Sequence, residues 1–180
     1  MKGVILSAGV GSRFGPYTQY EHKLLLKIND IPVIDYTLLA FSRAGVTDIG
    51  IVTGFMADRI TDWVGDGHRY GINVRYIYNS DYKLGNALSV QVAQTFTNDQ
   101  AFVLSMGDHM ISSSLITDVL ELGGSYEDNV LGVDFDSDLL QANDATRVQV
   151  EAEGTISSIG KHIKEWNGID SGVFRFNSGI

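Results

Sequence analysis

Short runs of apolar residues alternate with stretches of helical period along the first 135 residues of the chain. Residues 4–6, 49–52 and 102–104 are continuous apolar runs too short for helices, which is typical of strands buried on both faces. Residues 72–78 are rich in β-branched and aromatic side chains, and residues 130–133 are mainly apolar. We therefore predict that all five segments are strands of one buried sheet.

Amphipathic segments separate these predicted strands. Residues 34–41, 56–64, 86–92 and 115–120 carry apolar side chains at helical spacing. A chain in which strands and helices alternate in this way favours a parallel sheet with helices packed on both of its faces.

The pattern changes after about residue 140. Residues 146–150 and 155–159 alternate in polarity on either side of a Glu153-Gly154 turn, and residues 173–176 have a similar pattern. These segments predict an antiparallel arrangement. The expected fold class is α/β, with a Rossmann-like, mainly parallel sheet, helices on both faces and a small antiparallel β extension.

Composition narrows the classes of protein to which the chain can belong. The 180 residues suffice for one core, and with 44% apolar residues the chain is too hydrophobic to be disordered. The net charge of −9 argues against general nucleic-acid binding, and the lack of cysteine excludes disulfides and thiolate metal sites. Without a signal peptide or an apolar stretch long enough to span a membrane, the chain is expected to be cytoplasmic.

A glycine-rich loop follows the first predicted strand. It contains Ala8, Gly9, Gly11, Ser12 and Arg13, and its glycines would let backbone N–H groups approach phosphate oxygens. The spacing matches neither the dinucleotide-binding fingerprint nor the Walker A loop. The arginine, two residues after the second glycine, is suited to gripping phosphate oxygens. This predicts a nucleotide site, while an ordinary tight turn is the alternative.

Lys23 lies ten residues beyond Arg13 and opens the apolar run 24–26, which is predicted to be a short strand. By itself such a lysine could simply face solvent at a strand edge. Together with the loop it indicates a second cation for the same phosphates. Its neighbour His22 is expected to be a packing or surface residue rather than a catalyst.

The loop, Lys23 and a turn at Pro32 together resemble the sugar-nucleotide pyrophosphorylase superfamily of nucleotidyltransferases. The family usually has Pro-Lys where this chain has His22-Lys23. Within the superfamily the chain is most similar to the inositol-1-phosphate cytidylyltransferases. The resemblance covers residues 3–176 and implies a fold of the nucleotide-diphospho-sugar transferase type.

The resemblance assigns a nucleotide-binding segment and a metal ligand. Gly85, Asn86 and Ser89 match a segment that in the family lies against the base. By themselves, these residues would be the start of a helix capped by Asn86. Asp108 ends the strand at 102–104 in a Gly-Asp pair, where the family places the carboxylate that holds Mg²⁺. The implied catalytic residues are Arg13, Lys23 and Asp108.

The resemblance also assigns the acceptor side. His109 completes a Gly-Asp-His form found in the inositol enzymes, and Arg147 and Lys161 match basic residues expected to face the phosphate of the acceptor. Asp170 matches an Asp-Thr-Gly aspartate expected to face its hydroxyls. Taken one by one, Arg147, Lys161 and Asp170 would be solvated strand residues.

The implied reaction joins CTP to a small phosphomonoester, with inositol 1-phosphate favoured, and gives a CDP-alcohol and pyrophosphate. Phosphocholine, an aminoalkyl phosphonate, or a sugar 1-phosphate with another nucleotide are alternatives within the same class. A module that binds nucleotide for sensing, without turnover, is an alternative of another class. A dinucleotide-dependent reductase is disfavoured by the loop spacing, and the sequence does not indicate an oligomeric state.

The resemblance also implies that the catalytic domain of the family is longer than these 180 residues. Family members continue past the Asp-x-Gly strand to a Trp-x-Asp-x-Asp segment, whose aspartate completes the metal site. Residues 173–180 contain no such segment. The expectation is therefore one nucleotidyltransferase domain over residues 1–180 that lacks its C-terminal part, with weak metal binding and low activity by itself.

Overall fold

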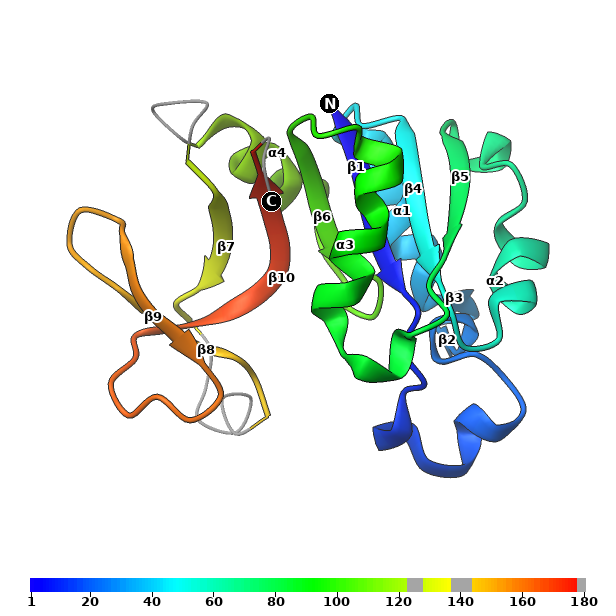
Figure 1. The fold of residues 1–180 in the computed structure, drawn as a ribbon, viewed down its shortest axis with the longest axis horizontal. Helices are drawn as coiled ribbons and strands as arrows, with labels where there is room; N and C mark the ends of the chain where they lie inside the picture. The colour runs from blue at the N-terminus through cyan, green and yellow to red at the C-terminus, as the bar shows by residue number, and fades with distance from the viewer. Residues whose placement is uncertain (123–127, 137–143, 178–180) are drawn as a thin grey trace.

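A single mixed sheet forms the centre of the protein in the computed structural model, which describes residues 1–122, 128–136 and 144–177, apart from the side chains of Arg13 and Phe14 (Figure 1). The strands are β1 (Lys2–Ser7), β2 (Lys27–Ile28), β3 (Ile31–Pro32), β4 (Asp48–Thr53), β5 (Asn73–Tyr78), β6 (Phe102–Met106), β7 (Val130–Asp134), β8 (Arg147–Val150), β9 (Ile156–Gly160) and β10 (Gly168–Phe176). The helices are α1 (Val33–Arg43), α2 (Ala57–Val64), α3 (Asn86–Thr97) and α4 (Ser113–Glu121), with short 3-10 segments η1 (Ser12–Gln19), η2 (Lys23–Leu25), η3 (His68–Tyr70) and η4 (Tyr82–Leu84).

The sheet is parallel on one side and antiparallel on the other. Its strand order is β5-β4-β1-β6-β10-β8-β9, with β7 also paired to β10. The four strands from β5 to β6 run parallel, with Val4 of β1 lying between Gly50 of β4 and Leu104 of β6. The predicted apolar runs are therefore the buried centre of the sheet, as expected for strands covered on both faces.

Helices cover the two faces of the sheet unequally. Ile5 and Val103 pack with α1, α2 and α4 on one face, whereas Val4, Leu6 and Leu104 pack with α3 on the other. Successive residues of a strand point to opposite faces, so each continuous apolar run supplies both layers of the core. Figure 1 shows α3 in front of the sheet and α1 behind it. The predicted α/β fold with helices on both faces is confirmed.

The antiparallel part centres on β10, which lies between the parallel strands and the extension. Its C-terminal half pairs with β6, its N-terminal end pairs with β8, and β7 lies along it. The strand predicted at 130–133 is present as β7, but its partner is an antiparallel strand from the end of the chain. The pairing of β7 with β10 shifts register between Asp170 and Phe174, which marks a bulge.

One local prediction is wrong. Residues 24–26 are not a strand, because Lys23–Leu25 form the 3-10 segment η2 and the following strand is Lys27–Ile28. Leu24 is fully buried in the core cluster with Ile5 and Ile34, so its apolar character reflects the packing of a tight turn rather than strand pairing. Among the described residues, no helix is both long and apolar enough to cross a membrane.

Candidate active site

The segments after β1 and β6 meet at one edge of the sheet, because the two strands are parallel neighbours. The carboxyl ends of parallel strands are where ligands bind in open α/β sheets. Gly107 N donates to Leu6 O, which ties the segment after β6 to the end of β1. The glycine-rich loop and the Gly-Asp pair, nearly 100 residues apart in sequence, are therefore held side by side.

The side chain of Lys23 packs along the glycine-rich loop. A Cβ added to Gly11, whose φ is +70°, would lie 2.8 Å from Lys23 Cδ, and one on Gly9 would lie 3.7 Å from Lys23 Nζ. Gly11 is thus needed both for its left-handed backbone and for the space that the lysine stem occupies. Ala8 is buried and Ser12 is exposed. The side chain of Arg13 lies outside the described part, so its phosphate-binding role stays a prediction.

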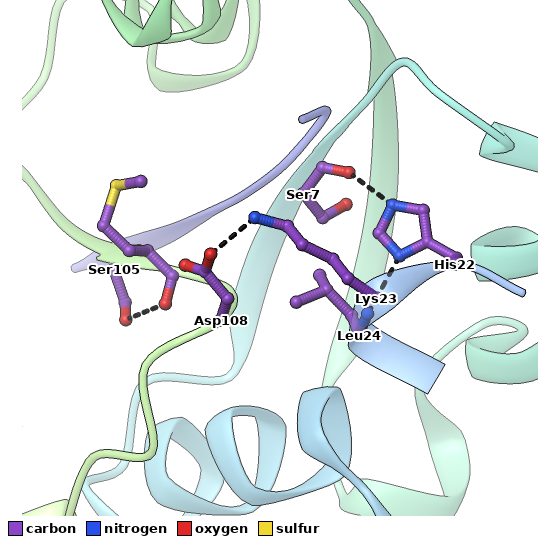
Figure 2. A network of polar contacts seen from close by, with 7 residues as sticks. Ser7, His22, Lys23, Leu24, Ser105 and Asp108 are labelled. Atoms are coloured by element: carbon purple, nitrogen blue, oxygen red, sulfur yellow. Dashed lines mark hydrogen bonds and ion pairs between the residues drawn. The ribbon is translucent and has the colours of Figure 1, made fainter. Parts of the chain in front are cut away.

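Lys23 reaches the carboxylate at the end of β6. Its Nζ lies 2.5 Å from Asp108 Oδ2, and the two side chains are only 13% and 18% exposed (Figure 2). Burial is the largest single influence and by itself would raise the pKa of Asp108, but the charge and hydrogen bond of Lys23, together with His109 and a backbone hydrogen bond, hold the pKa below its usual value. The predicted cation and the predicted metal carboxylate therefore form one ionised pair beside the loop.

His22 is a residue that sequence reasoning left outside the site. Its side chain is 0% exposed, its Nε2 lies 3.1 Å from Ser7 O, and Leu24 N donates to its Nδ1 at 3.1 Å. Because Nδ1 accepts a hydrogen bond, the proton of the neutral ring must be on Nε2, which then donates to Ser7 O. Burial, helped by the charge of Lys23, lowers the pKa of His22 to about 4.

The buried neutral ring makes stability sensitive to acid. An unfolded histidine takes up a proton near pH 6.5, whereas the folded ring does so only near pH 4. Between these values the unfolded state binds more protons, so the unfolding free energy should fall by up to about 3 kcal/mol as the pH drops. Urea titrations from pH 7.5 to 4.5 would measure this fall.

The matched variants are His22→Asn and His68→Asn, since His68 is exposed. The pH dependence of the unfolding free energy should flatten only in His22→Asn. An equal slope in the wild-type protein and in His22→Asn would show that another group is responsible.

The predicted base-binding segment begins α3. Gly85 has φ 116° and precedes the first helical residue, so Asn86 starts the helix rather than capping it. Asn86 lines the cleft described below. Ser89 is 3% exposed and accepts a hydrogen bond from Asn79 Nδ2 at 3.0 Å. Ser89 thus links α3 to the end of β5 inside the core, and a direct contact with a base stays a prediction.

A cleft of about 340 Å³ opens beside Asp108 between α3, β6 and β10. Five residues predicted from the sequence line it together: Asn86, Asp108, His109, Lys161 and Asp170. The volume lies in the range of small-molecule sites. The other lining residues, which the sequence analysis did not assign to the site, are Leu6, Ala87, Val90, Leu104, Met106, Asp144, Thr146, Phe174 and Phe176.

His109 packs directly against the bulge in β10. Its Nδ1 lies 2.8 Å from Ser171 O, and Gly172 N donates to Asp170 Oδ1 at 2.6 Å. Burial raises the pKa of Asp170, although the bond from Gly172 opposes that effect. The ring of His109 therefore holds the strand that carries Asp170 beside the cleft.

Arg147 is placed differently from the other predicted acceptor residues. It is not among the residues that line the cleft. Its Nη1 donates to Ile163 O at 3.3 Å, and its guanidinium lies 5.5 Å from the Trp166 ring centroid. These contacts hold the side chain on the segment between β9 and β10, so a direct contact with the acceptor phosphate stays a prediction.

A larger hollow of about 410 Å³ lies farther along α3. Asp99 is the one charged residue among those lining it, which otherwise are mainly amide and apolar residues. Phosphate groups need cations or free amides, so the smaller cleft beside Lys23 and Asp108 is the better candidate for phosphate chemistry.

Comparison with known proteins agrees with this geometry. A family model described as nucleotidyl transferase matches residues 2–147. The glucose-1-phosphate thymidylyltransferase of Streptomyces antibioticus is 38% identical over 111 residues, which is 62% of this chain and 31% of that protein. The bifunctional IPC transferase and DIPP synthase of Archaeoglobus fulgidus is 29% identical over 180 residues, which is 100% of this chain and 34% of that protein.

The structure of the inositol-1-phosphate CTP transferase from T. maritima superposes with a TM-score of 0.84 at 26% identity, covering 98% of this chain and 70% of that one. The chain spans about a third of the length of the curated relatives described above. The matched family region contains β1, the glycine-rich loop, Lys23 and Asp108. The chain belongs to the nucleotidyl transferase family.

Proposed function

We propose that this chain carries out cytidylyl transfer, joining CTP to a phosphorylated alcohol with release of pyrophosphate, and that inositol 1-phosphate is the favoured acceptor. The observation that carries the proposal is the Lys23–Asp108 pair, which lies between the glycine-rich loop and a cleft with both polar and apolar walls. A donor triphosphate and an acceptor phosphate bound on these two sides would meet at the pair.

In this reaction a phosphate oxygen of the acceptor attacks the α-phosphorus of CTP. The bond from that phosphorus to the bridging oxygen breaks, and the electron pair leaves with pyrophosphate. The nucleophile is already an anion, so no strong general base is required. The difficulty is to bring two anions together, which cations and fixed positions overcome. Lys23 would neutralise the α-phosphate, while the loop amides and Arg13 would hold the β- and γ-phosphates.

The residues fit a magnesium ion that is shared with the substrate. Among residues 1–122, 128–136 and 144–177, no group of three His, Asp or Glu side chains could hold a metal. Mg²⁺ commonly takes one or two carboxylates and completes its shell with phosphate oxygens and waters. Asp108 would be the carboxylate, and the ion would neutralise charge on the triphosphate when bound.

The cleft suits an acceptor that has both a phosphate and hydroxyl groups. Lys161 is the one lysine that lines it and would face the phosphate. Asp144, Thr146 and Asp170 also line the cleft and offer hydrogen-bonding groups for hydroxyls. The inositol-1-phosphate CTP transferase of similar fold and the relative aligned over all 180 residues support a polyol phosphate.

A sugar 1-phosphate with another nucleotide is the second candidate. The glucose-1-phosphate thymidylyltransferase of Streptomyces antibioticus has the higher identity, but its match covers 62% of this chain. The family model ends at residue 147, ahead of Lys161 and Asp170. The favoured and the alternative reaction would thus share the phosphate machinery and differ on the acceptor side.

A screen of nucleotides against acceptors tests the proposal. Pyrophosphate release would be followed with CTP, UTP, dTTP, ATP and GTP, each with inositol 1-phosphate, glucose 1-phosphate, phosphocholine and 2-aminoethylphosphonate. We expect Mg²⁺-dependent release with CTP and inositol 1-phosphate above every other pair, and its loss with a chelator. Turnover of glucose 1-phosphate with dTTP or UTP instead would establish the second candidate. Binding of nucleotide without release from any pair would identify a sensing module.

A further inference from the structure

Lys23 depends on its surroundings for its position, because its side chain is long. Its ammonium reaches Asp108, while its Cβ, Cγ and Cδ pack within 3.2 Å of where a side chain at Gly11 would begin. The direction of the stem is thus set by the backbone at residue 23. A displacement of about 1 Å in a reacting group costs on the order of 100-fold in rate.

His22, the residue before Lys23, ties that backbone to the sheet and to the residue after Lys23. Its ring donates to Ser7 O, the last residue of β1, and accepts from Leu24 N, the residue after Lys23. Leu25 N also donates to His22 O at 2.8 Å, which closes the turn of η2. Figure 2 shows the ring of His22 and the chain of Lys23 extending from adjacent residues toward β1 and Asp108.

The ring itself has no access to a ligand. It is fully buried, with the Phe55 ring 6.4 Å away between centroids. Both of its nitrogens have protein partners, so neither is available to a substrate. Loss of the hydrogen bonds of a buried polar group usually lowers the stability of the fold. Here one bond ties His22 to the end of β1 and the other ties it to Leu24, so the two bonds fix the backbone on either side of the catalytic candidate Lys23.

We propose that His22 is a positioning residue that holds Lys23 against the phosphate site through its bonds to β1 and η2. The inference rests on the proposed function, since it assumes that Lys23 acts on the donor phosphate. The two bonds are separable: asparagine can keep the acceptor for Leu24 N, glutamine can keep the donor to Ser7 O, and phenylalanine keeps the ring and neither bond.

The test combines two measurements on His22→Asn, His22→Gln and His22→Phe, with His68→Asn and His68→Gln as exposed controls. The first is acylation of Lys23 in ligand-free protein, measured by mass spectrometry against Lys27, which is exposed. We expect labelling of Lys23 to rise severalfold in His22→Phe and less in the variants that retain one bond. Unchanged labelling of Lys23 in all three variants would overturn the proposal.

The second measurement is a double-mutant cycle with Lys23→Ala, using kcat for pyrophosphate release. His22→Phe should lower kcat by between ~10-fold and ~100-fold with little change in the KM for CTP. In the Lys23→Ala background it should have no further effect, because a residue that acts through another is not additive with it. Additive losses would overturn the proposal and assign His22 to the fold alone.

Failure of the proposed function would look different. The wild-type chain would then release no pyrophosphate, or Lys23→Ala would be fully active. The labelling experiment needs no turnover and still decides whether His22 positions Lys23. If His22→Phe does not fold, the Asn and Gln variants, each with one bond intact, carry both measurements.

Discussion

Replacing Lys23 by alanine is expected to lower kcat for pyrophosphate release by about 100-fold or more, because one preorganised charge on the transition state is lost. The cation faces Asp108 beside the glycine-rich loop, where it is only 13% exposed and therefore acts with little screening by water. Binding of CTP should weaken less than turnover, since other groups hold the β- and γ-phosphates. Steady-state kinetics with saturating acceptor would separate the two effects.

Lys27→Ala is the matched control. Lys27 is exposed, lies four residues away in β2, and is not part of the cleft. Its replacement should leave kcat and KM unchanged. Circular dichroism and the thermal midpoint of both variants would establish that they fold. Full turnover in a folded Lys23→Ala protein would remove Lys23 from the mechanism and with it the main support for the proposed chemistry.

The second large effect is expected from Gly172→Ala. Gly172 lies in the bulge of β10 with φ +80°, and a Cβ there would lie 2.8 Å from His109 Cε1 and closer still to Nδ1. A left-handed backbone costs about 1–2 kcal/mol for an L-residue, and overpacking a filled space costs about 1–3 kcal/mol more. The unfolding free energy should therefore fall by about 3 kcal/mol in urea titrations.

Gly154→Ala separates the two causes. Gly154 has φ +89° in the turn between β8 and β9, and its added Cβ would meet no atom within 4 Å. This variant should lose only the backbone part, about 1–2 kcal/mol. Equal losses of unfolding free energy in the two variants would show that the His109 ring moves aside without an energetic cost. If the His109 ring cannot move aside, Gly172→Ala should also raise the KM for the acceptor, because Asp170 lies only two residues before Gly172.

Much of the fold could be predicted from the chain alone. The apolar runs at 4–6, 49–52 and 102–104 are too short for helices, which favours strands buried on both faces. Their alternation with helical segments predicted that these strands run parallel. The glycines after β1 and the Gly-Asp pair after β6 lie at strand ends in order. Their closeness follows once β1 and β6 are taken as parallel neighbours.

The apolar pattern was wrong at one place. Residues 24–26 are apolar because Leu24 packs in the core, not because they form a strand. The bond of Ser89 to Asn79 and the position of Arg147 over Trp166 were not foreseen either, and the binding roles of Ser89 and Arg147 stay predictions. The spacing of apolar residues along the sequence indicates which residues are buried, but it does not identify the residues against which each of them packs.

The sequence by itself determined the main strands and helices, the glycine-rich loop and the residue types suited to phosphate, since these depend on backbone preference and on periodic burial. Only the tertiary structure decided that β10 inserts antiparallel beside β6, that Lys23 pairs with Asp108, and that His22 joins β1 to η2 as a neutral buried ring. Each of these depends on which strands lie side by side. The order in which strands pair depends on the free energy of the whole packed core, so it cannot be predicted from any local stretch of sequence.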